Sequence, residues 1–296
     1  MSTLNTILVA TDLSAPSLVA VSRGLDLADQ HHLECTILHV LPRDLLFELE
    51  RLIGRSGSTF ERDAIERQTR ELNSSVKALL EGRHLDVHTR LRCGKPAEEI
   101  AEQARQDGVD LIVVSSHGKG VVRRLVLGST TLGVLQDSPC PVLVVKSPES
   151  RAYRKVILAI DFSEASTAVM QAALRYAPNA HFVLMHFLQA PFEEMQGLAL
   201  LDASKVIEYR QSALDQATRQ LDEIAQSLAL DSDQYSIEVM LDSHHHAWSS
   251  AQERLRCDLI VTGKHGHHVT RDRILGSFTQ SLLAQADCDV LVVQPS

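Results

Sequence analysis

A glycine-bearing segment in the last quarter of the chain has the residue types that could bind a phosphorylated ligand. Residues 262–266 read Thr-Gly-Lys-His-Gly, and Gly276-Ser277 follows after nine further residues. Glycine has no Cβ, so its backbone can approach a ligand closely. A helix starting after Gly276 would offer N–H groups and a positive dipole end to phosphate. The spacing lacks the Gly-Lys-Ser/Thr ending of a P-loop. The pattern therefore predicts two separate clamps on one nucleotide.

The same pattern occurs 148 positions earlier in the chain. Gly118 precedes Gly266 by this interval, and Gly128 precedes Gly276 by the same interval. An Asp-Leu-Ile-Val run lies before each loop, and a Val-Leu-Val-Val run follows each predicted helix. A repeat of this length is a domain rather than a solenoid unit. With 296 residues in total, we predict two domains, residues 1–147 and residues 154–296, joined by a short polar linker that contains a proline.

The composition narrows the class of protein. Hydrophobic residues make up 44% of the chain and the formal net charge is -9, which argues against a general nucleic-acid or membrane-surface binder. We expect no nucleic-acid partner. No apolar stretch approaches the length of a membrane span or of a signal peptide. We therefore expect no membrane partner.

The cysteines indicate the compartment. There are five of them, and none forms a Cys-x-x-Cys pair. Most lie in or beside apolar runs, so we expect buried free thiols. Such thiols suit a reducing compartment, and we expect the protein to be cytoplasmic.

Predicted strands and helices alternate along both halves. The first half opens with a buried strand over 6–10, a helix to about residue 30 and a strand over 35–40. We predict that residues 42–58 are irregular or partly helical and that 60–80 form a long charged helix. This order predicts a parallel sheet with helices on both faces in each half. Ligands of such sheets bind beyond the carboxyl ends of the strands. Asp12 and Asp161 follow the first strand of each half, so we expect them at the binding edge.

Four fragments in each half resemble the universal stress protein family. They are the strand and turn Ile-Leu-Val-Ala-Thr-Asp-Leu-Ser with its partner Val-Ile-Leu-Ala-Ile-Asp-Phe-Ser, the Leu-His-Val and Met-His-Phe fragments, the glycine loops, and the closing Val-Leu-Val-Val runs. The second half matches the Gly-x2-Gly-x9-Gly-Ser/Thr pattern of the nucleotide-binding members. The first half has Ser115 in place of the first glycine. The chain is thus similar to a tandem universal stress protein.

The resemblance implies a fold, a ligand and a set of binding residues. The fold would be two tandem Rossmann-like (adenine nucleotide alpha hydrolase-like) α/β domains, each with a five-stranded parallel sheet. The ligand would be ATP, ADP or AMP, with or without magnesium. The implied binding residues of the second half are Asp161, Phe187, Gly263, Gly266, Gly276 and Ser277. Their counterparts in the first half are Asp12, Val40, Ser115, Gly118, Gly128 and Ser129. We expect Ser115 to weaken binding in the first half without abolishing it.

Three functions remain open from the sequence. We favour an ATP-binding protein with a regulatory or protective role in the stress response, and we assign no catalytic residue. A slow ATP hydrolase is one alternative, although no residue pair clearly supplies a base and a positioned water. An interaction scaffold that needs no nucleotide is the other. The glycines could also simply shape tight turns.

Two further expectations concern assembly and metals. Exposed edge strands tend to be paired, so we expect the two domains to pair through Val142–Val145 and Val290–Val293. A homodimer of the whole chain is also compatible with the sequence. The run His244-His245-His246 invites a metal interpretation. Consecutive side chains diverge and no further ligand spacing is recognisable, so we assign no metal site.

Overall fold

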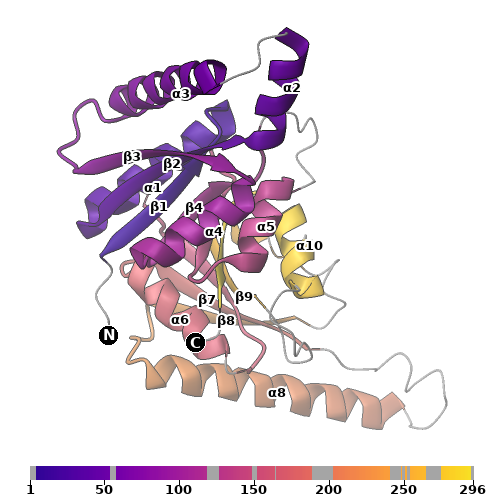
Figure 1. Ribbon diagram of the computed structural model, residues 1–296. Helices are drawn as coiled ribbons and strands as arrows, with labels where there is room; N and C mark the ends of the chain where they lie inside the picture. The colour runs from indigo at the N-terminus through magenta and orange to yellow at the C-terminus, as the bar shows by residue number, and fades with distance from the viewer. Residues whose placement is uncertain are drawn as a thin grey trace. The chain divides into compact units, whose positions relative to one another are not determined.

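We describe a computed structural model of the chain (Figure 1). The described residues are 5–53, 58–118, 127–148, 152–163, 165–188, 203–240, 248, 251, 254–264 and 275–294. They form two compact units, which we treat separately. Unit 1 comprises residues 1–151 with 270–275 and 287–294, and unit 2 comprises 152–269 with 276–286 and 295–296.

Unit 1 alternates strands and helices from its first described residues. Its elements in chain order are β1 (Thr6–Thr11), α1 (Ala15–His31), β2 (Glu34–Pro42), α2 (Arg43–Ile53), α3 (Ser58–Leu79), β3 (Val87–Gly94), α4 (Pro96–Asp107), β4 (Leu111–Ser115), α5 (Ser129–Asp137) and β5 (Val142–Val145). Proline stands in the first turn of both α1 and α4, where its missing N–H costs no helical hydrogen bond.

The strands of unit 1 form a mostly parallel sheet. Strand β1 pairs with β2 on one side and β4 on the other, while β3 extends the sheet beyond β2 and β5 extends it beyond β4. The order is therefore β3-β2-β1-β4-β5. From β1 the chain continues to β2 and β3 on one side, and from β3 it crosses to β4 on the other side of β1. The sheet therefore has a switch point between β1 and β4, where ligands of such sheets bind.

One strand from the second half of the sequence completes unit 1. Strand β10 (Asp289–Val293) pairs antiparallel with β5, and Val290 is opposite Val144 in this register. The buried Asp289 accepts hydrogen bonds from the backbone N–H groups of Lys146 (2.8 Å) and Ser147 (2.9 Å). The Arg23 side chain reaches the same carboxylate. An exposed edge at β5 is thus covered by a strand of the same chain.

Unit 2 repeats the pattern of parallel strands. Its elements are β6 (Lys155–Ala159), α6 (Ala165–Tyr176), β7 (His181–Phe187), α8 (Ala203–Ser227), β8 (Tyr235–Met240), β9 (Leu259–Gly263) and α10 (Ser277–Gln285). Strand β6 pairs in parallel with β7 and β9, and β7 pairs in parallel with β8. We expected five strands in the second half. Four of them, β9, β6, β7 and β8, lie in unit 2, whereas the fifth, β10, groups with unit 1.

The predicted elements agree with the structure except at their ends and at one segment. Residues 42–58, which we predicted as irregular or partly helical, contain the eleven-residue helix α2. In the second half, α8 runs from Ala203 to Ser227, and residues 189–202 and 241–247 lie outside the described part.

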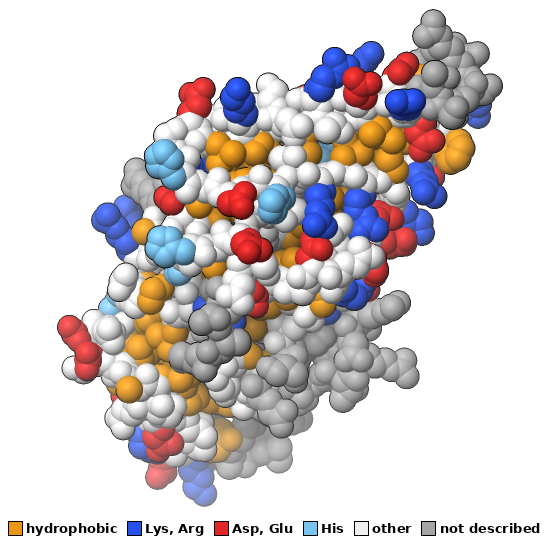
Figure 2. All heavy atoms as spheres, turned by 60° about the vertical axis from the view of Figure 1, so that its left-hand side comes forward, with side chains coloured by type: hydrophobic (Ala, Val, Ile, Leu, Met, Phe, Trp, Pro, Cys, Tyr) orange, Lys and Arg blue, Asp and Glu red, His pale blue; other side chains and the backbone are white. Residues whose placement is uncertain are grey.

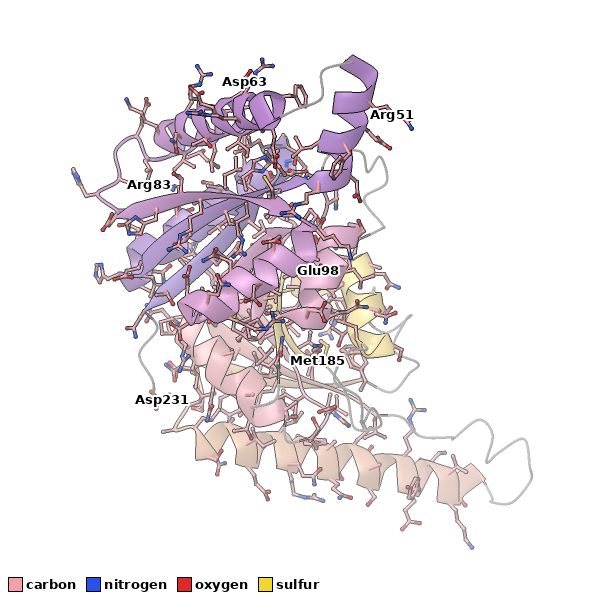
Figure 3. All side chains as sticks on the ribbon, in the orientation of Figure 1. Arg51, Asp63, Arg83, Glu98, Met185 and Asp231 are labelled. Atoms are coloured by element: carbon pink, nitrogen blue, oxygen red, sulfur yellow. The ribbon has the colours of Figure 1, made fainter. Side chains whose placement is uncertain are left out.

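Close helix packing positions the sheet of unit 1. A Cβ on Gly24 of α1 would lie 2.5 Å from Val9 of β1, so α1 rests directly on the strand. A Cβ on Gly133 of α5 would lie 2.6 Å from that of Ala97, so α5 touches α4, and Figure 1 shows the two side by side. Arg83, labelled in Figure 3 in the loop between α3 and β3, donates to Asp26 of α1. The contacts of Gly24 and Asp26 fix α1 against the sheet and against the loop before β3.

The cores are apolar and the visible surface is mixed in charge. The inner strands β1, β4, β6 and β9 bury most of their side chains, and Met185 of β7, labelled in Figure 3, is fully buried. On the face in Figure 2, acidic and basic side chains are interspersed. Within the described residues, no helix has the length and hydropathy required to cross a bilayer.

Candidate functional site

The turn after β1 in unit 1 holds Asp12 through a network of hydroxyl groups. The Oδ1 atom of Asp12 accepts hydrogen bonds from the N–H (3.0 Å) and the hydroxyl of Ser14, which caps α1. The Ser17 hydroxyl lies 2.9 Å from that of Thr11 and 3.3 Å from the backbone nitrogen of Asp12. Leu13, between Asp12 and the cap, has a φ of 61°, which a leucine rarely adopts. The network therefore holds a strained turn in one conformation.

The glycine loop of unit 1 lies directly against this turn. A Cβ on Gly118 would lie 2.3 Å from the Oδ2 atom of Asp12, so any larger residue would force the carboxylate to shift. Further along the chain, the N–H of Gly128 donates to the carbonyl of Ser116 at 2.9 Å. The loop after β4 is thereby joined both to the aspartate turn and to the start of α5. Asp12, Gly118 and Gly128, which the sequence analysis assigned to one site, belong to one connected cluster.

The start of α5 is suited to an anion. Gly128 is the N-cap residue and no side chain caps the helix, whose first turn contains no acidic residue. Ser129, the first helical residue, is exposed. Thr131 in the same turn is turned inward, and its hydroxyl donates to the carbonyl of Ser115 at 2.7 Å. A helix start with these properties attracts negative charge.

Unit 2 builds the same turn with serines at the matching positions, two and five residues after the aspartate. The Oδ1 atom of Asp161 accepts from the N–H of Ser163 (3.0 Å) and from the hydroxyls of Ser163 (2.6 Å) and Ser166 (3.1 Å). Its Oδ2 atom accepts no hydrogen bond from the described residues. Phe162 follows with a φ of 60°. The strained hydrophobic residue after the aspartate is thus a shared feature of both units.

The helix start of unit 2 also matches that of unit 1. The N–H of Gly276 donates to the carbonyl of Lys264 at 3.0 Å, and the Thr279 hydroxyl donates to that of Gly263 at 2.9 Å. Gly276 caps α10 without a side-chain hydrogen bond, and Ser277 is exposed. The candidate Gly266 lies outside the described residues.

Two positions differ between the units. The Ser115 hydroxyl, in place of the glycine of unit 2, donates to the carbonyl of His117 at 2.9 Å and is used within the loop. Lys264, in the position of Ser116, is only 4% exposed. Lys264 therefore does not extend into solvent beside the site, and Lys119 lies outside the described residues.

A pair of histidines supports the two turns, and the sequence analysis assigned them no role. The Nδ1 atom of His39 lies 2.8 Å from the carbonyl oxygen of Thr11, and that of His186 lies 2.8 Å from the carbonyl oxygen of Ile160. Each carbonyl belongs to the residue just before the site aspartate. Because a carbonyl only accepts, each Nδ1 carries the proton. The repeated Leu-His-Val and Met-His-Phe fragments were the available signal.

We predict that His186 makes the stability of unit 2 depend on pH. Burial lowers the pKa of His186 below its ordinary 6.5, although the Ile160 carbonyl and Asp161 act in the opposite direction. The unfolded chain therefore binds the proton first as the pH falls. This contribution to stability is complete above about pH 6.5 and is lost as the pH falls below it.

The matched variant is His186→Asn, whose amide keeps a donor near the Nδ1 position but does not titrate. Urea unfolding of both proteins between about pH 7.5 and about pH 5 measures the difference in unfolding free energy. We expect the difference to shift in favour of the variant as the pH falls. If the unfolding free energies of the two proteins differ by the same amount at every pH in this range, the prediction is wrong.

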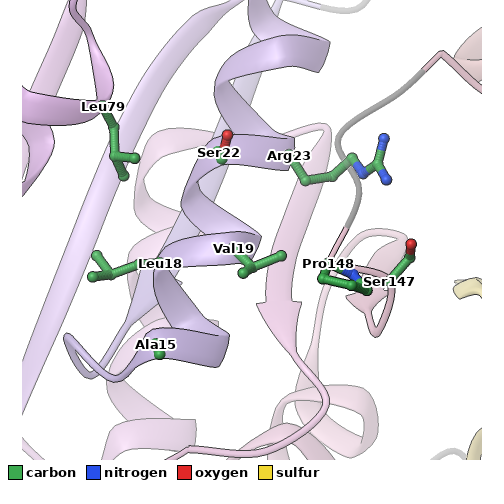
Figure 4. Close-up of a pocket in the computed structure, with 8 residues that line it drawn as sticks. All are labelled: Ala15, Leu18, Val19, Ser22, Arg23, Leu79, Ser147 and Pro148. Carbon is green, nitrogen blue, oxygen red and sulfur yellow. The ribbon is translucent and has the colours of Figure 1, made fainter.

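A cavity in unit 1 lies along the flank of α1. It has a volume of about 350 Å³ and lies beside α1, between Leu79 at the end of α3 and the Ser147-Pro148 segment (Figure 4). Leu18, Val19 and Ser22 of α1 contribute to its walls. None of the candidate binding residues lines this cavity.

The described residues offer no further reactive centre. No group of three or more His, Cys, Asp or Glu side chains among them is placed to hold a metal ion, and residues 244–246 lie outside this part of the chain. Burial raises the pKa of the Cys35 and Cys140 thiols to about 12, so both remain protonated and unreactive at neutral pH. The lone Trp248 is buried.

The fold and the repeated turn, loop and helix start define a tandem α/β protein of the Rossmann-like type. Residues 3–146 and 152–294 each match the sequence model of the Universal stress protein family. The chain therefore belongs to the universal stress protein family, with two copies in tandem.

Known proteins match either the whole chain or one half of it. A universal stress protein of Mycolicibacterium smegmatis is 24% identical over 98% of this chain and 97% of its own length. The universal stress protein MJ0577 of Methanocaldococcus jannaschii is 32% identical over 49% of this chain and 96% of its own length. The crystal structure of a universal stress protein from Archaeoglobus fulgidus covers 99% of both chains with a TM-score of 0.71 at 18% identity. This last similarity shows that the fold is shared.

Proposed function

We propose that this chain binds an adenine nucleotide in each half and acts as a regulatory binding protein in the stress response. The observation that carries the proposal is the cluster formed by the aspartate turn, the glycine loop and the uncapped helix start. In unit 1 the Gly118 backbone touches the Asp12 carboxylate, and the same loop is bonded to Gly128 at the start of α5. A ligand with hydroxyl donors at one end and phosphates at the other fits this order of groups.

Each part of the cluster has a chemical counterpart in a nucleotide. The Oδ1 atoms of Asp12 and Asp161 are already bonded to serines, which fixes the orientation of each carboxylate. In unit 2 the Oδ2 atom of Asp161 is the acceptor that a ribose or adenine donor would use. The helix starts at Gly128 and Gly276 would bind phosphate through backbone N–H groups. Magnesium would then arrive with the nucleotide phosphates.

A binding role fits these groups better than hydrolysis. Hydrolysis needs a base that orients a water molecule at the γ-phosphate. In each unit the aspartate already has one oxygen committed to the turn that it stabilises. The buried free thiols suit a reducing compartment, so we place this function in the cytoplasm. We further propose that the β5–β10 pairing joins the two domains as the dimer contact would in a single-domain protein.

The test is a calorimetric titration of the purified protein with ATP, ADP, AMP and cAMP, with and without magnesium. We expect two equivalents of an adenine nucleotide to bind per chain. Phosphate release measured in the same samples separates binding from slow hydrolysis. If a properly folded protein binds none of these ligands, the nucleotide proposal is wrong and the scaffold alternative replaces it.

A further inference from the structure

The candidate site of unit 2 contains an aromatic pair. Phe187 is the last residue of β7 and Phe278 is the second residue of α10. Their ring centroids are 5.0 Å apart and the ring planes are tilted by 55°. Aromatic rings attract each other in such tilted arrangements. The two residues thus make a direct contact between the end of a strand and the start of the candidate phosphate-binding helix.

The pair spans the carboxyl end of β6, where the site aspartate lies. Strand β7, which ends at Phe187, pairs with β6 on one side. Strand β9, which leads toward α10, pairs with β6 on the other side. A contact between Phe187 and Phe278 therefore crosses the end of β6 just before the turn that contains Asp161. This is the position at which ligands of parallel sheets bind.

Unit 1 has no aromatic ring at either position. Val40 follows His39 as Phe187 follows His186, and Thr130 follows Ser129 as Phe278 follows Ser277. The turn after the first strand is also aromatic in unit 2 and not in unit 1. Phe162 of unit 2 lies 4.4 Å from the His186 ring, centroid to centroid, whereas Leu13 is its counterpart in unit 1. The two sites share their polar framework and differ in the apolar surface beside it.

The burial of the pair suits a surface that faces a ligand. Phe187 is 8% exposed, while Phe278 is only half-buried although it lies in the turn that starts the helix. The exposed part of the Phe278 ring is apolar surface that a planar group could contact. Stacking of a nucleobase on an aromatic side chain is a substantial and sequence-tolerant contribution to binding.

We propose that Phe187 and Phe278 form the base-stacking surface of the unit 2 site. The unit 2 site would then prefer ligands that carry a nucleobase over bare phosphates, and the unit 1 site would not have this preference. This inference rests on the proposed nucleotide binding. It makes Phe278 a specificity-determining residue. The unit 1 site, with Val40 and Thr130, holds its ligand mainly through the phosphates and the aspartate.

The experiment measures the unit 2 site with two probes, ATP and inorganic tripolyphosphate, which has no base. The parent protein carries Gly128→Glu, which removes the unit 1 site from the titration. The variants are Phe278→Thr, which installs the unit 1 residue, Phe278→Leu, which keeps apolar bulk, and Phe278→Tyr, which keeps the ring. We expect the Thr and Leu variants to weaken ATP binding by about tenfold or more. The Tyr variant should stay close to the parent, and tripolyphosphate affinity should not change.

The reciprocal exchange tests the same inference in unit 1. The double substitution Val40→Phe with Thr130→Phe, in a Gly276→Glu parent, should strengthen ATP binding severalfold and leave tripolyphosphate binding unchanged. Melting temperatures of all variants confirm that each is folded.

The possible results separate this inference from the proposed function. If the parent binds ATP and Phe278→Thr binds it equally well or more tightly, the inference is wrong while nucleotide binding stands. Equal losses of ATP and tripolyphosphate would also overturn it, because they would indicate a general change of the helix start. If the parent protein and the unsubstituted chain bind neither probe, both proposals are wrong.

Discussion

Replacing Gly276 with glutamate should remove one bound nucleotide per chain, and replacing Gly128 with glutamate should remove the other. Both glycines are N-cap residues with φ near −60°, a backbone conformation open to any residue. A Cβ on Gly128 would lie 3.5 Å from its nearest neighbour, the Cα of His117, which is an ordinary contact. A Cβ at position 128 therefore meets no clash, and at either position the carboxylate of a glutamate would compete with phosphate at the helix start.

The expected loss is large because two negative charges would share one small region. Charges about 4 Å apart near a protein surface repel by roughly 4 kcal/mol, so we expect affinity at the altered site to fall by roughly a hundredfold or more. Calorimetric stoichiometry shows the effect directly as a change from two equivalents to one. The matched controls are Gly128→Ala and Gly276→Ala, which add a Cβ without charge and should retain both sites.

The same titration shows whether Ser115 impairs unit 1. If the unsubstituted protein binds one equivalent and only Gly276→Glu removes it, the unit 1 site is inactive, and Ser115→Gly is the variant that should restore it. Retention of two full equivalents in either glutamate variant would contradict the assignment of these helix starts to the nucleotide sites.

Replacing Asp289 with alanine should destabilise unit 1 by about 3–5 kcal/mol, the usual cost of removing one partner from a buried ion pair. The side chain of Asp289 is 0% exposed and that of Arg23 is 5% exposed, with 3.0 Å between Arg23 Nε and Asp289 Oδ2. Loss of the carboxylate leaves the guanidinium buried without its counter-charge. It also removes the acceptor of two backbone N–H groups, those of Lys146 and Ser147.

Urea unfolding measures this change, and hydrogen exchange at β5 and β10 shows where it acts. The control is Glu102→Ala, which breaks a pair with Arg105 whose side chains are about half exposed and should cost less than about 1 kcal/mol. The double variant Arg23→Met with Asp289→Asn should cost less than the sum of its two single variants, because it leaves no buried charge unpaired. Equal effects of Asp289→Ala and Glu102→Ala would show that the buried pair does not anchor β10.

Local patterns in the sequence determined much of the site before the structure was considered. The repeat of 148 positions, the strands that precede Asp12 and Asp161, and the helix starts at Ser129 and Ser277 were all predicted. Apolar strands, turn residues and helix starts depend on neighbours within a few positions, so a single sequence carries them. The segment of α2 was left undecided, because a short amphipathic stretch between charged residues has weak local preferences.

Only the tertiary structure decided which distant residues meet. Gly118 lies against Asp12 across more than one hundred positions, Phe278 meets Phe187, and Arg23 pairs with Asp289. Nothing near Phe278 in the sequence indicates an aromatic partner, and Asp289 resembles any aspartate at the start of a strand. Such contacts depend on sheet order and on which strands border β1 and β6. The sequence by itself therefore determined the family, the repeat and the polar framework of each site, while the folded sheets decided how the two sites differ and how the last strand is held.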